Sequence, residues 1–159
     1  NRDIITDFED EGDVVGDVVK VLAASTTHTT AAGNAPTLTA ISTAAVANGA
    51  AYSLGATGNS DIIELTVNDG VGDLSAATDG SELAKIVSAG SAVLTPTDNT
   101  KNFYILAYDD DGAGNDEAFL YYVTNDGTAA LTDAEIKLVA TFSTGITAGG
   151  FVAEDFILG

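Results

Sequence analysis

Alternating hydrophobic and polar positions predict strands along much of this chain. Ile63, Leu65 and Val67 recur at every second position, which is the period that a half-buried strand requires. The segments NFYILAY (102–108) and EAFLYYV (117–123) are aromatic and β-branched, and they flank the acidic stretch DDDGAGND. This pattern predicts a β-hairpin with an eight-residue acidic loop. A further strand is predicted over 136–142, with four residues on one face: Ile136, Leu138, Ala140 and Phe142.

Helical periodicity is confined to one short segment and one further turn. Asp79 can cap a helix that ends before Gly90, and Glu82 completes a capping box. Three apolar residues fall on one face of this helix: Leu83, Ile86 and Val87. Thr132 can cap one more turn just before the strand at 136–142. The sequence therefore predicts one or two short helices.

The remaining segments are short and rich in turn residues. Between 3 and 24, β-branched pairs are separated by Asp and Gly, which predicts short strands joined by acidic turns. The stretch 25–48 is nearly all Ala, Thr, Ser, Gly and Asn, and we expect a loop with one extended piece over 37–41. The whole pattern predicts a mainly β protein, a β-sandwich-like antiparallel domain that spans 1–159 as a single unit.

The acidic composition indicates cation binding. The chain carries 24 Asp and Glu against five Lys and Arg, a net charge of −19, yet 45% of its residues are hydrophobic, so it should fold. A strongly negative surface repels phosphate backbones and anionic lipids, so we expect neither nucleic-acid partners nor membrane insertion. Crowded carboxylates also repel one another unless a counter-ion lies between them. Calcium is therefore the predicted cofactor.

The loop of the predicted hairpin is the first candidate calcium site. It offers Asp109, Asp111, Asn115 and Asp116 within eight residues, and its two glycines let the backbone bend. Calcium takes about six to eight oxygen ligands, and a glycine-bent acidic loop can supply many of them locally. The alternative is a solvated hairpin tip, in which Asp, Asn and Gly act only as turn formers. Three consecutive Asp residues favour the calcium interpretation, although the spacing is not that of an EF-hand.

The densest acidic run lies near the N-terminus and is the second candidate site. Asp3 and Asp7 would share one face of a strand, and Asp10 or Asp13 could complete a site with them. A charge run is more often a solvated face. The sequence leaves these two interpretations open.

The residues needed for catalysis are scarce. The chain has no Cys, and its single histidine, His28, lies in the neutral tract STTHTT without a nearby acid or nucleophile. No GxSxG motif occurs, and zinc catalysis would lack His and Cys ligands. Glycoside cleavage needs only two carboxylates, so the inventory leaves it open, but there is no Trp on which a sugar could stack. We therefore expect a protein that is not an enzyme.

Three segments resemble the C-terminal region of RTX-type proteins, calcium-binding proteins exported by type I secretion. DIITDF (3–8) resembles a D-x-I-x-D-F segment, YDDDGAGNDEAFLYYVTNDG (108–127) a late hairpin with an acidic turn, and ITAGGFVAEDFIL (146–158) an L-T-x-x-D-F ending. The resemblance implies that nonapeptide repeats lie upstream, that the chain is a C-terminal fragment, and that its end contains an uncleaved secretion signal. The repeat GGxGxDxUx itself is absent from this sequence.

These observations favour an extracellular structural protein, secreted or at the cell surface. Within the RTX resemblance, a body rich in Ala, Thr and Gly is similar to surface-layer, adhesin or matrix proteins. We expect calcium-stabilised self-association into a layer or fibre, with the weakly charged stretch 25–48 as a contact surface and surface polysaccharide as a further candidate partner. The alternative is a non-catalytic secretion and folding module of an upstream enzyme or toxin. A polysaccharide-binding or hydrolysing domain is the third hypothesis.

Overall fold

The computed structural model describes the parts of the chain that form the sheets, the helix and the C-terminal segment. The described residues are 3–5, 19–21, 38–41, 51–52, 62–65, 74–76, 79–88, 95–96, 102–109, 117–124, 131–143, 146 and 149–158.

Strands dominate these residues, as predicted. The main sheet has six strands in the order β1 (Asp3–Ile5), β9 (Ile136–Phe142), β8 (Glu117–Val123), β7 (Phe103–Asp109), β5 (Ile62–Leu65) and β3 (Leu38–Ile41). Two small sheets pair β10 (Phe156–Leu158) with β2 (Val19–Val21) and β4 (Ala51–Tyr52) with β6 (Thr95–Pro96). The helical elements of the described ranges are α2 (Ser81–Ser88) and three 3₁₀ turns, η2 (Leu74–Ala76), η3 (Asp133–Glu135) and η4 (Ala153–Asp155). The prediction of a mainly β fold is confirmed.

The pairing is mixed, whereas we expected antiparallel strands. The hairpin is confirmed, because β7 and β8 pair antiparallel from Phe103 opposite Val123 to Asp109 opposite Glu117. β9 continues this antiparallel pattern on β8. However, β1 runs parallel to β9, and β3, β5 and β7 run parallel to one another. Parallel neighbours need a crossover connection, and the chain between β5 and β7 includes α2. Hairpin signals in a sequence do not reveal such pairs.

Both predicted helix starts carry a capping hydrogen bond, but the capping box predicted for the first does not form among the described residues, where the Glu82 carboxylate accepts from Lys85 instead. Asp79 Oδ1 accepts a hydrogen bond of 2.9 Å from the Ser81 N–H at the start of α2. At the second site the helical turn is the 3₁₀ turn η3, where Glu135 Oε2 accepts from both the N–H and the hydroxyl of Thr132, each at 2.8 Å. The three apolar residues predicted on one face of the helix, Leu83, Ile86 and Val87, are all buried.

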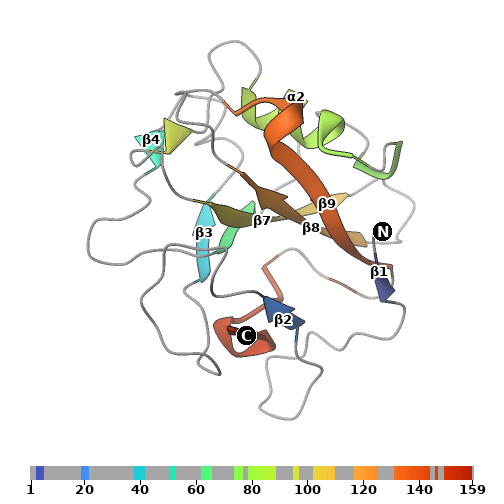
Figure 1. The fold of residues 1–159 in the computed structure, drawn as a ribbon. Coiled ribbons are helices and arrows are strands. Elements are labelled where there is room, and N and C mark those ends of the chain that lie inside the picture. The colour runs from blue at the N-terminus through green and yellow to red at the C-terminus, as the bar shows by residue number, and fades with distance from the viewer. Residues whose placement is uncertain are drawn as a thin grey trace.

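The inner strands of the main sheet, β5, β7, β8 and β9, are buried on both faces, so the described residues form three layers (Figure 1). On one face, α2 and η2 pack on alternate residues of the central strands, including Phe103, Ile105 and Phe119; we call this the helix face. On the other face, the intervening residues, including Leu106 and Leu120, pack against the C-terminal segment and β2; we call this the strap face. Figure 1 shows α2 on one side of the sheet and β2 with the C-terminus on the other.

A β-bulge in β9 corrects the prediction that four residues of this strand share one face. Leu120 lies opposite Ala140 but Tyr121 lies opposite Leu138, so Val139 is an extra residue without a partner on β8. The extra residue reverses the alternation of side chains. As a result Ile136 and Leu138 lie on the helix face, while Ala140 and Phe142 lie on the strap face.

Candidate functional site

Most strands of the main sheet end at the same edge. β1, β3, β5, β7 and β9 run in one direction, and β8 runs the opposite way. We call the side where these five strands end, and where β8 begins, the carboxyl edge. Ile5 at the end of β1 is aligned through Phe142 and Ala118 with Tyr108, one residue before the end of β7. Both acidic segments of the sequence therefore continue the chain from this edge, one after Ile5 and one after Asp109.

Two carboxylates face each other where the β7–β8 hairpin meets its loop. Asp109, the last residue of β7, lies directly opposite Glu117, the first residue of β8. The alternation along both strands places the two side chains on the helix face. Asp109 is only 7% exposed, and its Oδ2 accepts a hydrogen bond of 3.1 Å from the backbone N–H of Ser75 in η2. The pair thus brings two negative charges together at a partly desolvated position.

The helix face near this pair carries further negative charge. Tyr121 lies on β8 with its ring stacked on that of Phe119, at a centroid distance of 6.5 Å. Burial raises the pKa of the Tyr121 hydroxyl, and the negative charges of Asp109, Glu82 and Asp79 raise it further. Lys85 offsets part of this charge through its ion pair with Glu82, at 2.5 Å. The electrostatic field in this region therefore favours a cation.

Two buried hydroxyl groups on the same face lack hydrogen-bond partners within the described part of the chain. They are Tyr121 Oη and Thr141 Oγ1. Thr141 lies opposite Phe119, which is two residues from Glu117 along β8. Buried hydroxyls without partners are uncommon in folded proteins.

The other face of the sheet contains a buried acid that the sequence did not single out. Glu64 is 3% exposed in β5 and accepts hydrogen bonds from the Tyr108 hydroxyl and the Gly149 N–H. Burial raises the pKa of Glu64, while the two hydrogen bonds partly oppose that rise. We had predicted a half-buried strand here, but all four residues of β5 are buried. The adjacent pair Ile62-Ile63 was the signal that both faces are covered.

The predicted metal ligands are only partly placed by the structure. Asp109 ends β7, and Asp3 lies in β1 opposite Ala140. Asp3 is aligned with Leu106 through Ala140 and Leu120, so β9 and β8 separate it from β7. Neighbouring strands lie about 4.8 Å apart, so Asp3 and Asp109 are too distant to share one ion. The other predicted ligands lie outside the described residues: Asp7, Asp10, Asp13, Asp111, Asn115 and Asp116.

Within the described ranges, no group of three or more His, Cys, Asp or Glu side chains is arranged to hold a metal ion. Among the candidate metal ligands, the structure therefore brings together one pair of carboxylates, Asp109 and Glu117. Sequence reasoning included Asp109 but missed Glu117, although Glu117 follows Asp116 directly and begins the second strand of the predicted hairpin. Pairing the two predicted strands residue by residue would have placed it opposite Asp109.

Comparison with known proteins finds no matching family model, no similar curated protein and no similar solved structure. Among the described helical segments, none has the length and apolar character needed to cross a membrane.

Proposed function

We propose that this chain is a calcium-stabilised structural domain of an extracellular protein and that it assembles with copies of itself into a surface layer or fibre. The observation that carries the proposal is the Asp109–Glu117 pair at the base of the loop DDDGAGND. The sequence supplies the remaining support, namely its net charge of −19 and its resemblance to type I-secreted calcium-binding proteins.

The Asp109–Glu117 pair gives calcium a physical role. Like charges directly opposite each other on neighbouring strands destabilise a hairpin, by about 0.2 to 1 kcal/mol per pair. In the sequence, the loop between these residues adds further carboxylates, so the chain is rich in negative charge between the two strands. A divalent cation that binds the folded state removes the repulsion and stabilises the fold by mass action. Calcium suits such a loop better than magnesium, because its coordination geometry is more flexible.

The hydrogen bonds of the buried acids support a structural role more than a catalytic one. The two buried acids described above, Glu64 and Asp109, both accept hydrogen bonds from the backbone of another segment, so they tie elements together. Glu135 and Asp155 act locally instead, since each accepts a hydrogen bond from the residue that precedes its own 3₁₀ turn. Buried acids used in this way build a rigid unit, which is what a layer or fibre subunit requires.

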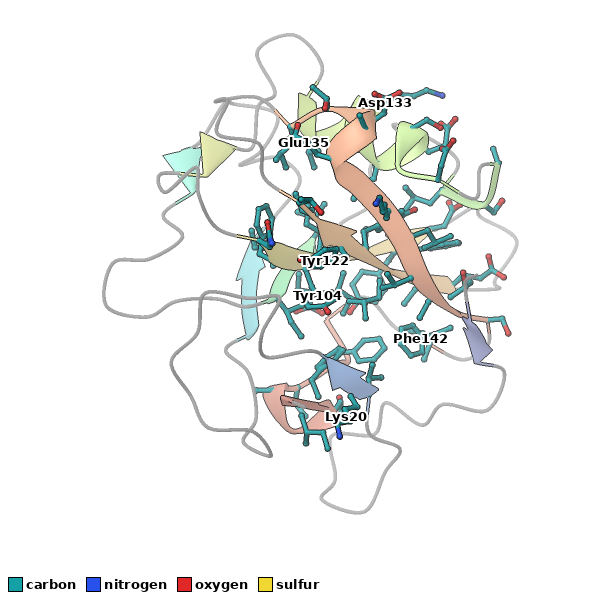
Figure 2. All side chains as sticks on the ribbon, in the orientation of Figure 1. Lys20, Tyr104, Tyr122, Asp133, Glu135 and Phe142 are labelled. Carbon is teal, nitrogen blue, oxygen red and sulfur yellow. The ribbon has the colours of Figure 1, made fainter. Side chains whose placement is uncertain are left out.

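Electron microscopy of the purified chain tests the assembly part of the proposal. We expect periodic sheets or filaments in calcium and their loss in EGTA. The double variant Asp109→Asn/Glu117→Gln should assemble poorly at the same calcium concentration. Asp133→Asn is the matched control, because Asp133 is an exposed acid in η3, at the opposite end of β9 from Phe142 and the carboxyl edge (Figure 2). Dispersed monomers in both calcium and EGTA would contradict the proposal.

A further inference from the structure

One buried carboxyl group joins three separate segments of the chain. Glu64 lies in β5, Tyr108 lies in β7, and Gly149 begins the segment 149–158, which we call the C-terminal strap. The Tyr108 hydroxyl and the Gly149 N–H both donate hydrogen bonds to the Glu64 carboxyl group. These contacts attach the start of the strap to the middle of the sheet.

The rest of the strap covers the sheet through aromatic packing. Phe151 is 3% exposed and contacts the rings of Tyr108, Phe142 and Phe156, at centroid distances of 6.3, 5.2 and 5.5 Å. Beyond it, β10 pairs with β2 rather than with the main sheet. The strap is therefore a separate layer that packs on the sheet through apolar side chains, and Glu64 makes a polar contact with the strap backbone at Gly149 (Figure 1).

We propose that Glu64 is a proton-controlled lock on the C-terminal strap, which docks most firmly when Glu64 is protonated and loosens when Glu64 ionises. The buried position of the carboxyl group and its contact with the strap backbone carry this inference. An ionised carboxylate under the strap loses its hydration, and two hydrogen bonds do not fully replace it.

The direction of the pKa shift agrees with this geometry. Burial is the largest influence and raises the pKa of Glu64 above its ordinary value of 4.5. When the strap lifts, water reaches the carboxyl group and its pKa returns toward the ordinary value. The docked state therefore binds more protons than the open state between the two pKa values. In that window docking weakens as pH rises, by at most about tenfold per pH unit for one proton.

The elements packed around Glu64 offer no described charge that would neutralise it. β3 (Leu38–Ile41) has no titratable residue in its sequence, and β7 contributes the Tyr108 hydroxyl. The strap carries Glu154 and Asp155, and Asp155 Oδ2 accepts a hydrogen bond of 2.8 Å from the Val152 N–H. Lys20 in β2 is exposed, and no ion pair to Glu64 occurs among the described residues.

Hydrogen exchange of the intact chain, followed from about pH 4.5 to about pH 8, tests the lock. Protection factors, which correct for the intrinsic pH dependence of exchange, are compared between the strap and α2. We expect protection in the strap to fall with rising pH while protection in α2 changes much less. Equal losses in both segments, or no pH dependence in the strap, would overturn the proposal.

Two variants separate the lock from general destabilisation. Glu64→Gln keeps the shape of the side chain without its charge, so strap protection should become independent of pH. Tyr108→Phe removes a donor that favours the ionised form, so the loss of protection should move to higher pH. Tyr104→Phe is the matched control on the same strand and face, and it should leave the midpoint unchanged. If Glu64→Gln does not fold, an unshifted midpoint in Tyr108→Phe is sufficient to reject the lock.

The lock does not depend on the calcium proposal, and its pH dependence has the opposite sign. Carboxylates that bind calcium lose the ion as they are protonated, so that stabilisation is lost as pH falls. The strap should instead loosen as pH rises. Repeating the exchange measurement in EGTA therefore distinguishes failure of one proposal from failure of the other.

Discussion

Asp109 and Glu117 face each other as the last cross-strand pair of the β7–β8 hairpin, with both side chains on the helix face of the sheet. Ser75 holds Asp109 in place through its backbone N–H. The hairpin therefore ends in two like charges, and the acidic loop begins at the same position. This relationship connects the fold to the proposed calcium dependence.

The substitution Glu117→Gln should have opposite effects with and without calcium. In EGTA it removes the repulsion with Asp109, so the free energy of unfolding should rise by about 0.2 to 1 kcal/mol. In saturating calcium it removes a proposed ligand, so the stabilisation that the ion gives should shrink. Urea unfolding in both buffers measures the two effects. Asp133→Asn, which makes the same change in charge at the opposite edge, should alter neither value by more than about 0.5 kcal/mol.

Replacing the buried Tyr121 hydroxyl tests whether it is truly without a partner. Because Tyr121 Oη has no hydrogen-bond partner among the described residues, Tyr121→Phe should leave stability unchanged or raise it by about 1 kcal/mol. Chemical denaturation of the variant gives the value directly. A loss of more than about 1 kcal/mol would show that the hydroxyl makes a favourable interaction in solution.

Gly80 allows α2 to approach β9 closely. A Cβ atom at this position would overlap the side chain and carbonyl oxygen of Ile136, the first residue of β9. Gly80→Ala should therefore destabilise the protein by about 1 to 3 kcal/mol, as overpacking does elsewhere. Thermal unfolding measures the loss. Adding Ile136→Val should recover little of it, because valine keeps the Cβ and Cγ2 atoms that the new methyl group would meet, and the backbone oxygen of Ile136 stays in place; full recovery would show that this overlap does not cause the loss.

Phe151 is the main apolar anchor of the strap. It is 3% exposed and packs against three aromatic rings, so Phe151→Ala should cost about 3 to 5 kcal/mol of unfolding free energy. Phe151→Leu keeps most of the volume and should cost less. If Phe151→Ala costs under about 1 kcal/mol, the strap does not dock as described.

Local sequence signals predicted the elements that depend on neighbouring residues. The hairpin followed from two aromatic segments on either side of an acidic loop, and α2 followed from Asp79 and its apolar face. Both depend on contacts within about 20 residues, for which turn and capping chemistry carry clear signatures.

Features that depend on distant contacts were not predictable in the same way. The parallel pairing of β1 with β9 joins two segments that lie far apart in the sequence, and no turn signal marks it. The bulge at Val139 changes the faces of Ala140 and Phe142 without changing the alternating pattern of the sequence. Glu64 looked like the outward residue of a half-buried strand, because the strap that covers it lies more than 80 residues later.

The candidate site was only partly predictable from the sequence, because one of its two residues depends on how the hairpin packs. Asp109 belongs to an obvious acidic loop, whereas the position of Glu117 opposite Asp109 follows only from the register of the hairpin. The register is fixed by which aromatic residues of β7 and β8 share a face, and that is a property of the packed core. Composition therefore predicted that carboxylates are the candidate ligands for a cation, and the fold brings one pair of them face to face.

The most direct test of the central claim is the melting temperature of the intact chain as calcium replaces EGTA. A site that is saturated 100-fold above its dissociation constant adds about 2.7 kcal/mol of stability. For a chain of this size, each kcal/mol corresponds to about 2 to 4 °C. We predict a rise of several degrees with calcium, a smaller rise with magnesium, and a reduced rise in Asp109→Asn/Glu117→Gln. An unchanged melting temperature at about 1 mM calcium, with no heat of binding by calorimetry, would contradict the claim.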